Sequence, residues 1–259
     1  MTISHNNTQG VVFITGGATG IGAASVKLFA ANGWQVAFID INDNAAAELI
    51  ENHVPEALYV HADTRDYKEV EAAVAACIER FGRIDSVFAN AGIHRRNTIL
   101  DISEEEFDLV VKTNIYGTFH TLRATVPHLK ANGGTIVINA SDQSVIGKRG
   151  NFAYGLTKGA LGQITKNLSA DLAPFGIRVN AVCPGTIKTP LVDKLFESVS
   201  SKSGMSVEEL WAEEDALFER GSAGTAEEVA ELVYFLAGNR SSFCTGGLFP
   251  VDGGLTAVR

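Results

Sequence analysis

The stretch VVFITGGATGIG, residues 11–22, joins an apolar run directly to a glycine-rich turn. Apolar residues on successive positions are typical of a parallel strand that is covered on both faces, and a helical pattern begins near Gly20. Gly16, Gly20 and Gly22 permit a tight turn, let backbone N–H groups approach a pyrophosphate, and let the helix pack closely against the strand. We therefore predict a strand–turn–helix unit that binds a dinucleotide, with a merely structural turn as the alternative.

The alternation of strand and helix patterns continues along the chain. Further strand patterns occur at residues 35–40, 57–62, 84–90, 134–141, 177–183 and 246–253, and amphipathic helical stretches at residues 20–32, 66–80, 103–131, 153–173 and 225–237. This alternation predicts an α/β fold in which a doubly wound parallel sheet of about seven strands carries helices on both faces. We expect residues 1–259 to form a single domain, with a Ser- and Glu-rich insertion at approximately 191–224 as a helical substrate lid.

Composition and charge narrow the classes of function. The formal net charge of −9 argues against nonspecific binding to nucleic acid or to an anionic membrane surface. Three distant cysteines, Cys77, Cys183 and Cys244, give no metal-ligand spacing and no disulfide framework. The N-terminal sequence MTISHNNTQG is polar, unlike a signal peptide, and no apolar run is long enough to span a bilayer. We expect a cytoplasmic protein without a metal site and without nucleic-acid or membrane partners.

Polar or small residues follow the predicted strands, at the edge of the sheet where ligands bind. Asp40 ends the second strand, 18 positions beyond Gly22. A carboxylate there can accept hydrogen bonds from both hydroxyls of an adenosine ribose and repel a 2′-phosphate, which predicts NAD as the coenzyme. A turn-capping aspartate is the alternative. The other strand ends carry Asp63, the run Asn90-Ala91-Gly92, Ser141 and the pair Pro184-Gly185.

Tyr154 and Lys158 open the helix that follows the fifth strand. Residues four positions apart lie on the same helix face, so both side chains point toward the same rim. Taken alone, the pair could also be one packed aromatic residue and one solvated lysine. The glycine turn and the polar strand ends on the same rim favour a working pair.

These residues together resemble the short-chain dehydrogenase/reductase family, over residues 11–256. The family motifs TGxxxGxG, NAG, YxxxK and PGxIxT correspond to Thr15–Gly22, Asn90–Gly92, Tyr154–Lys158 and Pro184–Thr189; the serine 13 positions before the tyrosine corresponds to Ser141, and the helix asparagine to Asn114. Ala89 and Ala226 are minor departures, where Asn and Pro are frequent.

The resemblance implies a Rossmann-like fold and NAD(H)-linked interconversion of a secondary alcohol and a ketone. Tyr154 would be the base, with its pKa lowered by the Lys158 ammonium and the nicotinamide. Ser141 would bind the substrate oxygen, and Asn114 would organise a water that relays protons from Lys158. Thr189 would orient the nicotinamide carboxamide, and Asp63 the adenine edge.

The resemblance also implies the coenzyme contacts and the assembly. The expected coenzyme-binding residues are Gly16, Thr19, Gly20, Ile21, Gly22, Asp40, Ile41, Asp63, Thr64, Asn90, Ala91, Gly92, Tyr154, Lys158, Pro184, Gly185, Ile187 and Thr189. A homotetramer or homodimer would pair through the helices at residues 103–131 and 153–173.

The residues expected to face the substrate are polar, namely His94, Arg95, Asp142, Gln143 and Thr186. A small hydroxy compound such as a sugar, a polyol or an anionic alcohol would suit them. Four cationic residues could bind an anionic group, be solvated or lie at a subunit interface, namely Arg95, Arg96, Lys148 and Arg149. Alternatives are the dehydrogenation of a cyclic or steroid-like apolar alcohol, another enzyme on this scaffold such as an epimerase, dehydratase or enoyl reductase, and an NAD(H)-sensing regulatory module.

Overall fold

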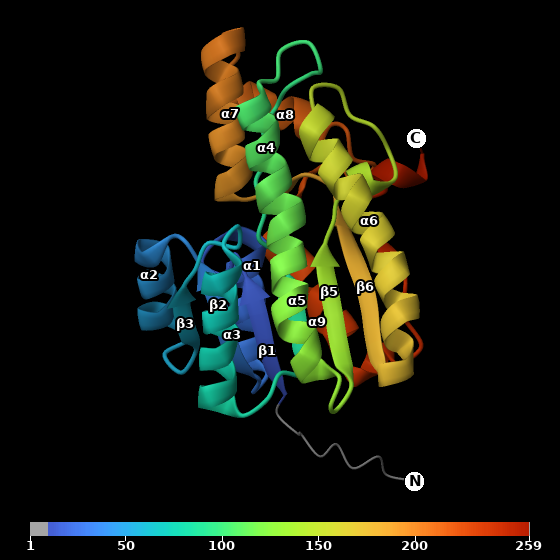
Figure 1. Cartoon of the computed structure of the whole chain (residues 1–259). Helices are drawn as coiled ribbons and strands as arrows, with labels where there is room; N and C mark the ends of the chain where they lie inside the picture. The colour runs from blue at the N-terminus through green and yellow to red at the C-terminus, as the bar shows by residue number, and fades with distance from the viewer. Residues whose placement is uncertain (1–9, 259) are drawn as a thin grey trace.

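A seven-stranded parallel sheet forms the centre of the computed structural model, which describes residues 10–258 (Figure 1). Its order is β3-β2-β1-β4-β5-β6-β9, with every neighbouring pair parallel. The strands are β1 (Val11–Thr15), β2 (Gln35–Asp40), β3 (Leu58–His61), β4 (Ser86–Ala89), β5 (Gly134–Asn139), β6 (Ile177–Pro184) and β9 (Leu248–Val251). The chain reverses direction across the sheet between β1 and β4, so the predicted doubly wound sheet is confirmed and its crevice lies beside β1.

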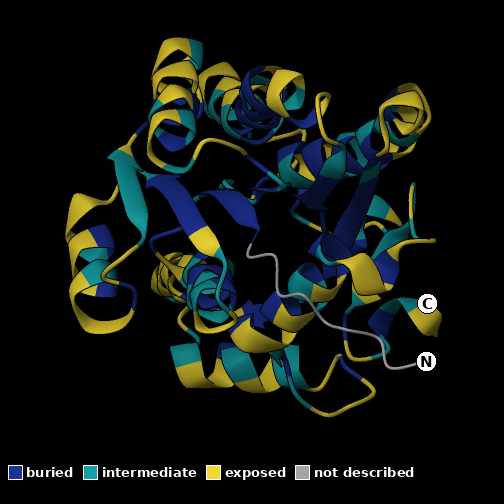
Figure 2. Ribbon diagram, turned by 90° about the horizontal axis from the view of Figure 1, so that it is seen from below, coloured by how far each residue is buried: buried dark blue, intermediate teal, exposed yellow. Residues whose placement is uncertain are grey.

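Helices cover both faces of this sheet. They are α1 (Gly20–Ala31), α2 (Asp43–His53), α3 (Tyr67–Phe81), α4 (Glu104–Val111), α5 (Gly117–Leu129), α6 (Phe152–Leu172), α7 (Pro190–Ser203), α8 (Val207–Asp215) and α9 (Ala226–Ala237). Helices α1, α2 and α9 share one buried apolar cluster with the sheet, and α3, α5 and α6 share another. Figure 2 shows the buried strands between helices whose outer surfaces are exposed.

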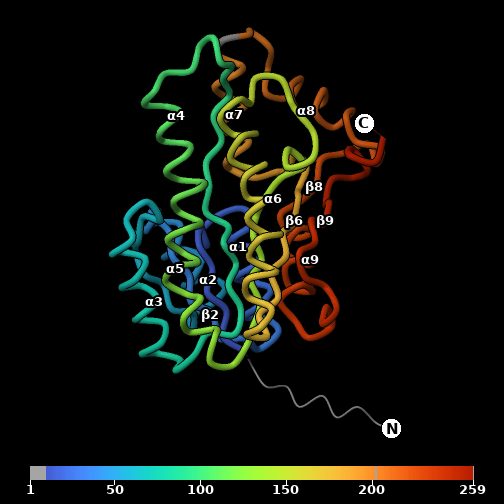
Figure 3. Tube along the Cα trace, turned by 45° about the vertical axis from the view of Figure 1, so that its right-hand side comes forward, coloured from blue at the N-terminus to red at the C-terminus, as the bar shows by residue number. Residues whose placement is uncertain are grey.

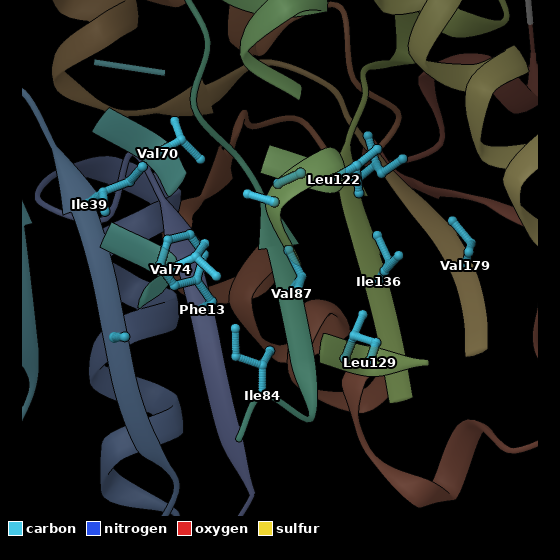
Figure 4. Packing of buried hydrophobic residues seen from close by; sticks show 14 of the residues in the cluster. Phe13, Ile39, Val70, Val74, Ile84, Val87, Leu122, Leu129, Ile136 and Val179 are labelled. Carbon is cyan, nitrogen blue, oxygen red and sulfur yellow. The ribbon is translucent and has the colours of Figure 1, made fainter. Parts of the chain in front are cut away.

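The core on the α3–α5 side consists of aliphatic and aromatic side chains from successive strands. Figure 4 shows Phe13, Val87 and Ile136 of three adjacent strands beside Val74 of α3 and Leu122 of α5. Phe13, Val87 and Ile136 are at most 1% exposed. Burial of each such side chain contributes about 1.5–3 kcal/mol, which holds the strand ends in fixed register.

The helix expected at residues 103–131 contains a π-helical turn. Residues Lys112–Tyr116 form this turn between α4 and α5, and the flanking residues keep right-handed helical backbone angles. Figure 3 shows α4 and α5 as one long rod. Asn114 lies within the π turn and is buried, which is the setting in which π turns often place functional side chains.

The segment expected as an insertion contains α7 and α8. Two short paired strands, β7 (Ile187–Lys188) and β8 (Gly224–Thr225), bracket it. Both helices lie beyond the carboxyl ends of the sheet strands (Figure 1). Neither the β7–β8 pair nor helix α2 was part of the sequence-based prediction.

The polar N-terminal sequence that bears on a signal peptide falls outside the described residues, apart from Gly10. Between residues 10 and 258, no helix has both the length and the hydropathy that crossing a bilayer requires.

Candidate active site

The glycine turn after β1 has a backbone that only glycine fits well. Gly16 and Gly20 have φ angles of 64° and 55°, in the left-handed region that other residues rarely adopt. A Cβ atom placed on Gly22 would lie 1.9 Å from the carbonyl oxygen of Gly16. The turn therefore forms a cradle of backbone groups at the start of α1, in which the glycines add no side chains of their own.

Asn90 fastens the loop after β4 to this turn. Its Nδ2 donates to the carbonyl oxygens of Thr15 and Gly16 at 2.9 and 3.0 Å, and its Oδ1 accepts from Asn139 at 2.8 Å. The Thr15 hydroxyl oxygen accepts from the backbone N–H groups of Asn90 and Ala91, each at 3.0 Å. Asn90 is thus part of the scaffold that fixes the crevice.

Asp40 lies at the end of β2, beside the glycine turn. Its carboxylate accepts hydrogen bonds from the backbone N–H groups of Ala18 at 2.9 Å and Asn42 at 3.0 Å. These contacts match the turn-capping alternative, yet a carboxylate offers about four lone-pair sites and two remain for ribose hydroxyls. The neighbouring Ile41 side chain is 62% exposed, as an adenine-packing residue would be in the free protein.

Asp63 and Thr64 lie just after β3, and their side chains contact neighbouring residues. The Arg65 guanidinium binds the Asp63 carboxylate at 2.5–3.0 Å and lowers its pKa. Thr64 is buried, and a Cβ atom on Gly117 would lie 2.7 Å from its hydroxyl. Arg65, which the sequence analysis did not single out, therefore pairs with Asp63 just after β3.

A cavity of about 430 Å³ lies at the carboxyl ends of β4, β5 and β6. Many of the expected site residues line it: Ile21, Asn90, Gly92, His94, Ser141, Asp142, Gln143, Tyr154, Lys158, Pro184, Gly185, Thr186, Ile187 and Thr189. Thr189 faces the glycine turn, because a Cβ atom on Gly20 would lie 3.2 Å from its methyl group. Arg95 is not among the lining residues; its guanidinium donates to the His94 carbonyl.

Lys158 is buried, and its ammonium forms a hydrogen bond with the last residue of β5. Its Nζ donates to the carbonyl oxygen of Asn139 at 2.6 Å and lies 5.5 Å from the centre of the Tyr154 ring. Burial lowers the pKa of Lys158 to about 8. Asn139 was not predicted as a site residue, although it ends β5 and precedes Ser141 by two positions.

The chain without coenzyme raises the pKa of Tyr154. Burial raises it well above its ordinary value, and the Asp142 charge raises it further. A hydrogen bond with Ser141 acts in the opposite direction. The lowering expected from Lys158 and the nicotinamide charge together concerns the enzyme with NAD⁺ bound and stays a prediction.

His94 stacks on the Tyr154 ring. The two ring centres are 4.1 Å apart with an interplanar angle of 27°. Burial lowers the pKa of His94 to about 4, so the imidazole is neutral at neutral pH. Its Nε2 donates to the Oδ1 atom of Asn151, a cavity-lining residue that the sequence analysis did not identify.

Asn114 forms hydrogen bonds to the backbone of the loop after β4. Its Oδ1 accepts from the Ile93 N–H at 2.8 Å, and its Nδ2 donates to the Ile93 carbonyl and the Thr157 hydroxyl, both at 3.0 Å. A Cβ atom on Gly92 would lie 3.2 Å from Asn114 Oδ1 and 3.8 Å from Lys158 Nζ. Asn114 thus lies near the lysine, while most of its hydrogen bonds serve the loop.

The two walls of the cavity differ in polarity. One wall carries charged and polar groups: Asp142 is 2% exposed, and the Lys148 ammonium lies 2.8 Å from its carboxylate. The opposite wall, from the α7–α8 segment, is mostly apolar and comprises Leu191, Val192, Leu195, Phe196, Glu214 and Leu217. Within residues 10–258, no group of His, Cys, Asp and Glu side chains is arranged to hold a metal ion.

Comparison with known proteins shows the family. Residues 16–256 match a family model described as enoyl-(acyl carrier protein) reductase. The chain is 34% identical to trans-4-hydroxycyclohexanecarboxylate dehydrogenase from Sinomonas cyclohexanicum, over 98% of this chain and 96% of that one. It is 35% identical to 2-(R)-hydroxypropyl-CoM dehydrogenase from Xanthobacter autotrophicus, over 96% and 99% of the two chains.

A solved structure agrees. The ligand-free aldohexose dehydrogenase of Thermoplasma acidophilum superposes with a TM-score of 0.88 at 30% identity, covering 97% of this chain and 95% of that one.

The chain belongs to the short-chain dehydrogenase/reductase family. It is accordingly an oxidoreductase that acts on CH–OH groups and takes a nicotinamide coenzyme. Membership of this family accounts for the glycine turn, the Asn90 loop and the tyrosine–lysine pair on one rim. Asp142, Lys148 and Glu214 line the same cavity as the candidate base. Asp142 was expected to face the substrate and Lys148 was one of four cationic residues that could bind an anionic group, whereas Glu214 had no expected role.

Proposed function

We propose that this enzyme interconverts a secondary alcohol and a ketone with NAD(H), on a small polar hydroxy compound. The observation that carries the proposal is the convergence of Ser141, Tyr154 and Lys158 on one cavity at the end of the glycine-turn crevice. These three residue types supply a hydrogen-bond donor for the substrate oxygen, a proton acceptor and a cation beside it.

The crevice fits a dinucleotide. Its glycine cradle leaves backbone N–H groups at the start of α1, the arrangement that binds a pyrophosphate. The Oδ1 atom of Asn139 is buried in the cavity wall without a hydrogen-bond partner from residues 10–258, as expected of a group that awaits a ligand. The Asp40 carboxylate supports NAD over NADP, since a 2′-phosphate would meet its charge.

The residues of the chain would act as follows. NAD⁺, when bound, accepts the hydride and adds a positive charge to the site. Ser141 would donate to the substrate oxygen and hold it beside Tyr154, which takes the hydroxyl proton. Because burial raises the pKa of Tyr154 in the free chain, we infer that Lys158 and the coenzyme charge act together to make it a working base. Asn114 would hold the loop and a proton-relaying water near Lys158.

The polar cavity wall supports a small polar substrate. Asp142 and Gln143 offer acceptors to substrate hydroxyls, and the Gln143 Oε1 atom is buried without a partner from the described chain. The compared relatives act, by name, on a hydroxycyclohexanecarboxylate, a hydroxypropyl-CoM and an aldohexose. We propose that the α7–α8 segment serves as the lid, and that the enzyme is a cytoplasmic homotetramer.

The apolar wall favours a second candidate, a cyclic alcohol with little polarity. Leu191 and Leu217 are 41% and 36% exposed at the cavity, and they would contact the C–H face of a ring. A sugar or a substituted cyclohexanol would use both walls, whereas a steroid would use chiefly this one.

The test is a screen of NAD⁺ and NADP⁺ reduction with polyols, sugars, hydroxy acids, simple cyclic alcohols and steroids. We expect turnover with NAD⁺ and a polar compound. Tyr154→Phe should lower kcat/KM by about 10²–10⁴-fold, the usual contribution of a general base. Tyr67→Phe, which removes an exposed hydroxyl that bonds Glu71, is the control and should leave turnover unchanged. Turnover with steroids alone would overturn the polar substrate, and full activity of Tyr154→Phe would overturn the mechanism.

A further inference from the structure

Two charged side chains of the segment after β5, Asp142 and Lys148, form a bridge with Glu214 of α8 in the cavity lining. Lys148 Nζ lies 2.8 Å from Asp142 Oδ2 and 4.0 Å from Glu214 Oε1. Asp142 follows β5, whereas Glu214 belongs to α8. The Glu214 carboxylate also accepts a hydrogen bond from the Thr186 hydroxyl.

One end of the bridge reaches the reacting groups. The Ser141 hydroxyl donates to Asp142 Oδ1 at 2.8 Å. The Asp142 carboxylate therefore holds this hydroxyl proton in the free protein, and the hydroxyl would turn from Asp142 to the substrate oxygen when it donates there. The other end reaches the α7–α8 segment, where Trp211 of α8 packs edge-to-face on Phe196 of α7 with ring centres 4.7 Å apart.

This bridge differs from a surface ion pair. Asp142 is 2% exposed, and the Lys148 and Glu214 side chains are 19% and 21% exposed. A carboxylate that is buried so completely is costly without a cationic partner. In contrast, Lys112 and Asp108 form an ion pair in which both side chains are 60% exposed, and such pairs contribute little.

We propose that Lys148 is a positioning residue, which holds the Asp142–Ser141 pair in place and fastens helix α8 over the cavity through Glu214. The ammonium is thereby committed to two carboxylates of the chain and is not the receptor for an anionic substrate group. This inference rests on the proposed function for its kinetic consequences, while the attachment of α8 is independent of the reaction.

The bridge also tunes the candidate base. The groups that face Tyr154 are His94 stacked on its ring, Asp142 after β5 and Lys158 on α6. Lys148 pairs with Asp142, and Glu214 lies next to Lys148. The Asp142 charge raises the pKa of Tyr154, and the positive charge of Lys148 beside it opposes that effect. Loss of Lys148 should therefore raise the pH at which alcohol oxidation reaches half of its maximal rate. Loss of the Asp142 charge should lower this pH.

The kinetic test compares Lys148→Met, Glu214→Gln and Asp142→Asn in the holoenzyme, with Lys148→Arg to retain the charge. We expect Lys148→Met to lower kcat/KM about tenfold or more and to raise the midpoint of the pH profile by about half a unit or more. Glu214→Gln should raise KM with little change in the pH midpoint. In the Asp142→Asn background, Lys148→Met should cost several-fold less, since contacting residues couple in a double-mutant cycle.

The second readout needs no substrate. Trp211 and Trp34 are the two tryptophans of the chain, and Trp211 lies on the same helix as Glu214. Acrylamide quenching of the fluorescence, with Trp211→Phe to identify the α8 signal, should rise about twofold in Lys148→Met and Glu214→Gln if α8 loosens. Lys112→Met, which removes the exposed ion pair between Lys112 of the π turn and Asp108 of α4, is the matched control and should match the wild type.

The outcomes separate the two proposals. Increased quenching without any alcohol turnover would support the bridge and overturn the proposed function. Wild-type quenching, pH profile and KM in Lys148→Met would overturn the bridge while leaving the dehydrogenase in place. Lys148→Met could fail to fold, and the other two variants then decide. Increased quenching in Glu214→Gln, with wild-type behaviour of Lys148→Arg, supports the bridge. Unchanged quenching in Glu214→Gln contradicts it.

Discussion

The two sides of the crevice differ in where their polar side chains find partners. On the coenzyme side, Asn90, Asn114 and Asp40 bond mainly to backbone groups of the protein itself. On the substrate side, the side chains of Asp142, Lys148 and Glu214 bond or pair with one another. Gln143 adds a buried oxygen that has no partner in the described part of the chain.

The difference indicates two ways of building a site. A side chain bonded to backbone cannot change without disturbing the loop it holds, so the coenzyme side is a fixed surface for an invariant ligand. Side chains bonded to each other can be exchanged as a set while the sheet stays intact. We infer that the substrate side is where relatives of this fold diverge in specificity.

The largest effect is expected for Gly22→Ala, on the coenzyme side. The new Cβ atom would lie 1.9 Å from the Gly16 carbonyl oxygen, so the turn must shift, and the free energy of unfolding should fall by about 4 kcal/mol. Urea unfolding and NADH binding measure this. Gly159→Ala is the control, since nothing lies within 4 Å of its Cβ position in α6, and it should stabilise by about 0.5–1 kcal/mol. Equal stability of the two variants would contradict the fixed-surface account.

Asn114→Ala should come next. It leaves the Ile93 N–H and carbonyl groups and the Thr157 hydroxyl without their partner, and unsatisfied buried groups destabilise by about 1–3 kcal/mol each before relaxation. We expect a loss of about 3 kcal/mol in urea unfolding. A loss of activity at wild-type stability would instead assign Asn114 to proton relay alone.

His94 should make stability depend on pH. Its pKa is lowered to about 4 from an ordinary value of 6.5, so between these values the unfolded chain binds a proton that the folded chain does not. Stability therefore decreases as pH falls through this window, by about 2 kcal/mol from this residue at pH 5. His94→Phe keeps a ring over Tyr154 and should remove that part of the dependence. A variant as acid-sensitive as the wild type would refute this role.

The smallest effect on stability should come from Gln143→Leu, on the substrate side. The variant removes a buried oxygen that has no partner in residues 10–258, so unfolding should change by only about 0.5 kcal/mol in either direction. Activity should still fall if Gln143 accepts a substrate hydroxyl. A loss of stability as large as that of Asn114→Ala would contradict the proposal that side chains on the substrate side can be exchanged without disturbing the fold.

Much of the fold follows from local pattern. Short apolar runs and glycine turns are properties of neighbouring residues, which is why the strands of the sheet lie close to their predicted positions and the carboxyl ends that carry Asp40, Ser141 and Thr189 lie on one side. The π turn around Asn114 was not predictable in this way. It depends on the tertiary contacts of Asn114 with Ile93 and Thr157.

The sequence predicted the motif residues of the site. It did not predict the charged contacts among them or the directions of their pKa shifts. The sequence places Asp142 beside Ser141, but Glu214 comes near them only because α8 packs over the cavity. The Tyr154 pKa direction likewise depends on burial, a tertiary property that spacing does not encode. The hydrogen bonds between Arg65 and Asp63 were not predicted, because the sequence assigned Asp63 only to the adenine edge.

The π-helical turn at Lys112–Tyr116 has a consequence for insertions and deletions in this chain. A π turn holds one residue more than the α-helical turn it replaces, so removing a residue there would yield a more regular helix. Because the π turn already accommodates the extra residue, the residues from Gly117 onward would keep nearly the same faces relative to α4. Gly117 would then stay in its close contact beneath Thr64. A single-residue gap at this point should therefore be tolerated by the packing of α5, and its cost should fall on the position of Asn114 within the turn.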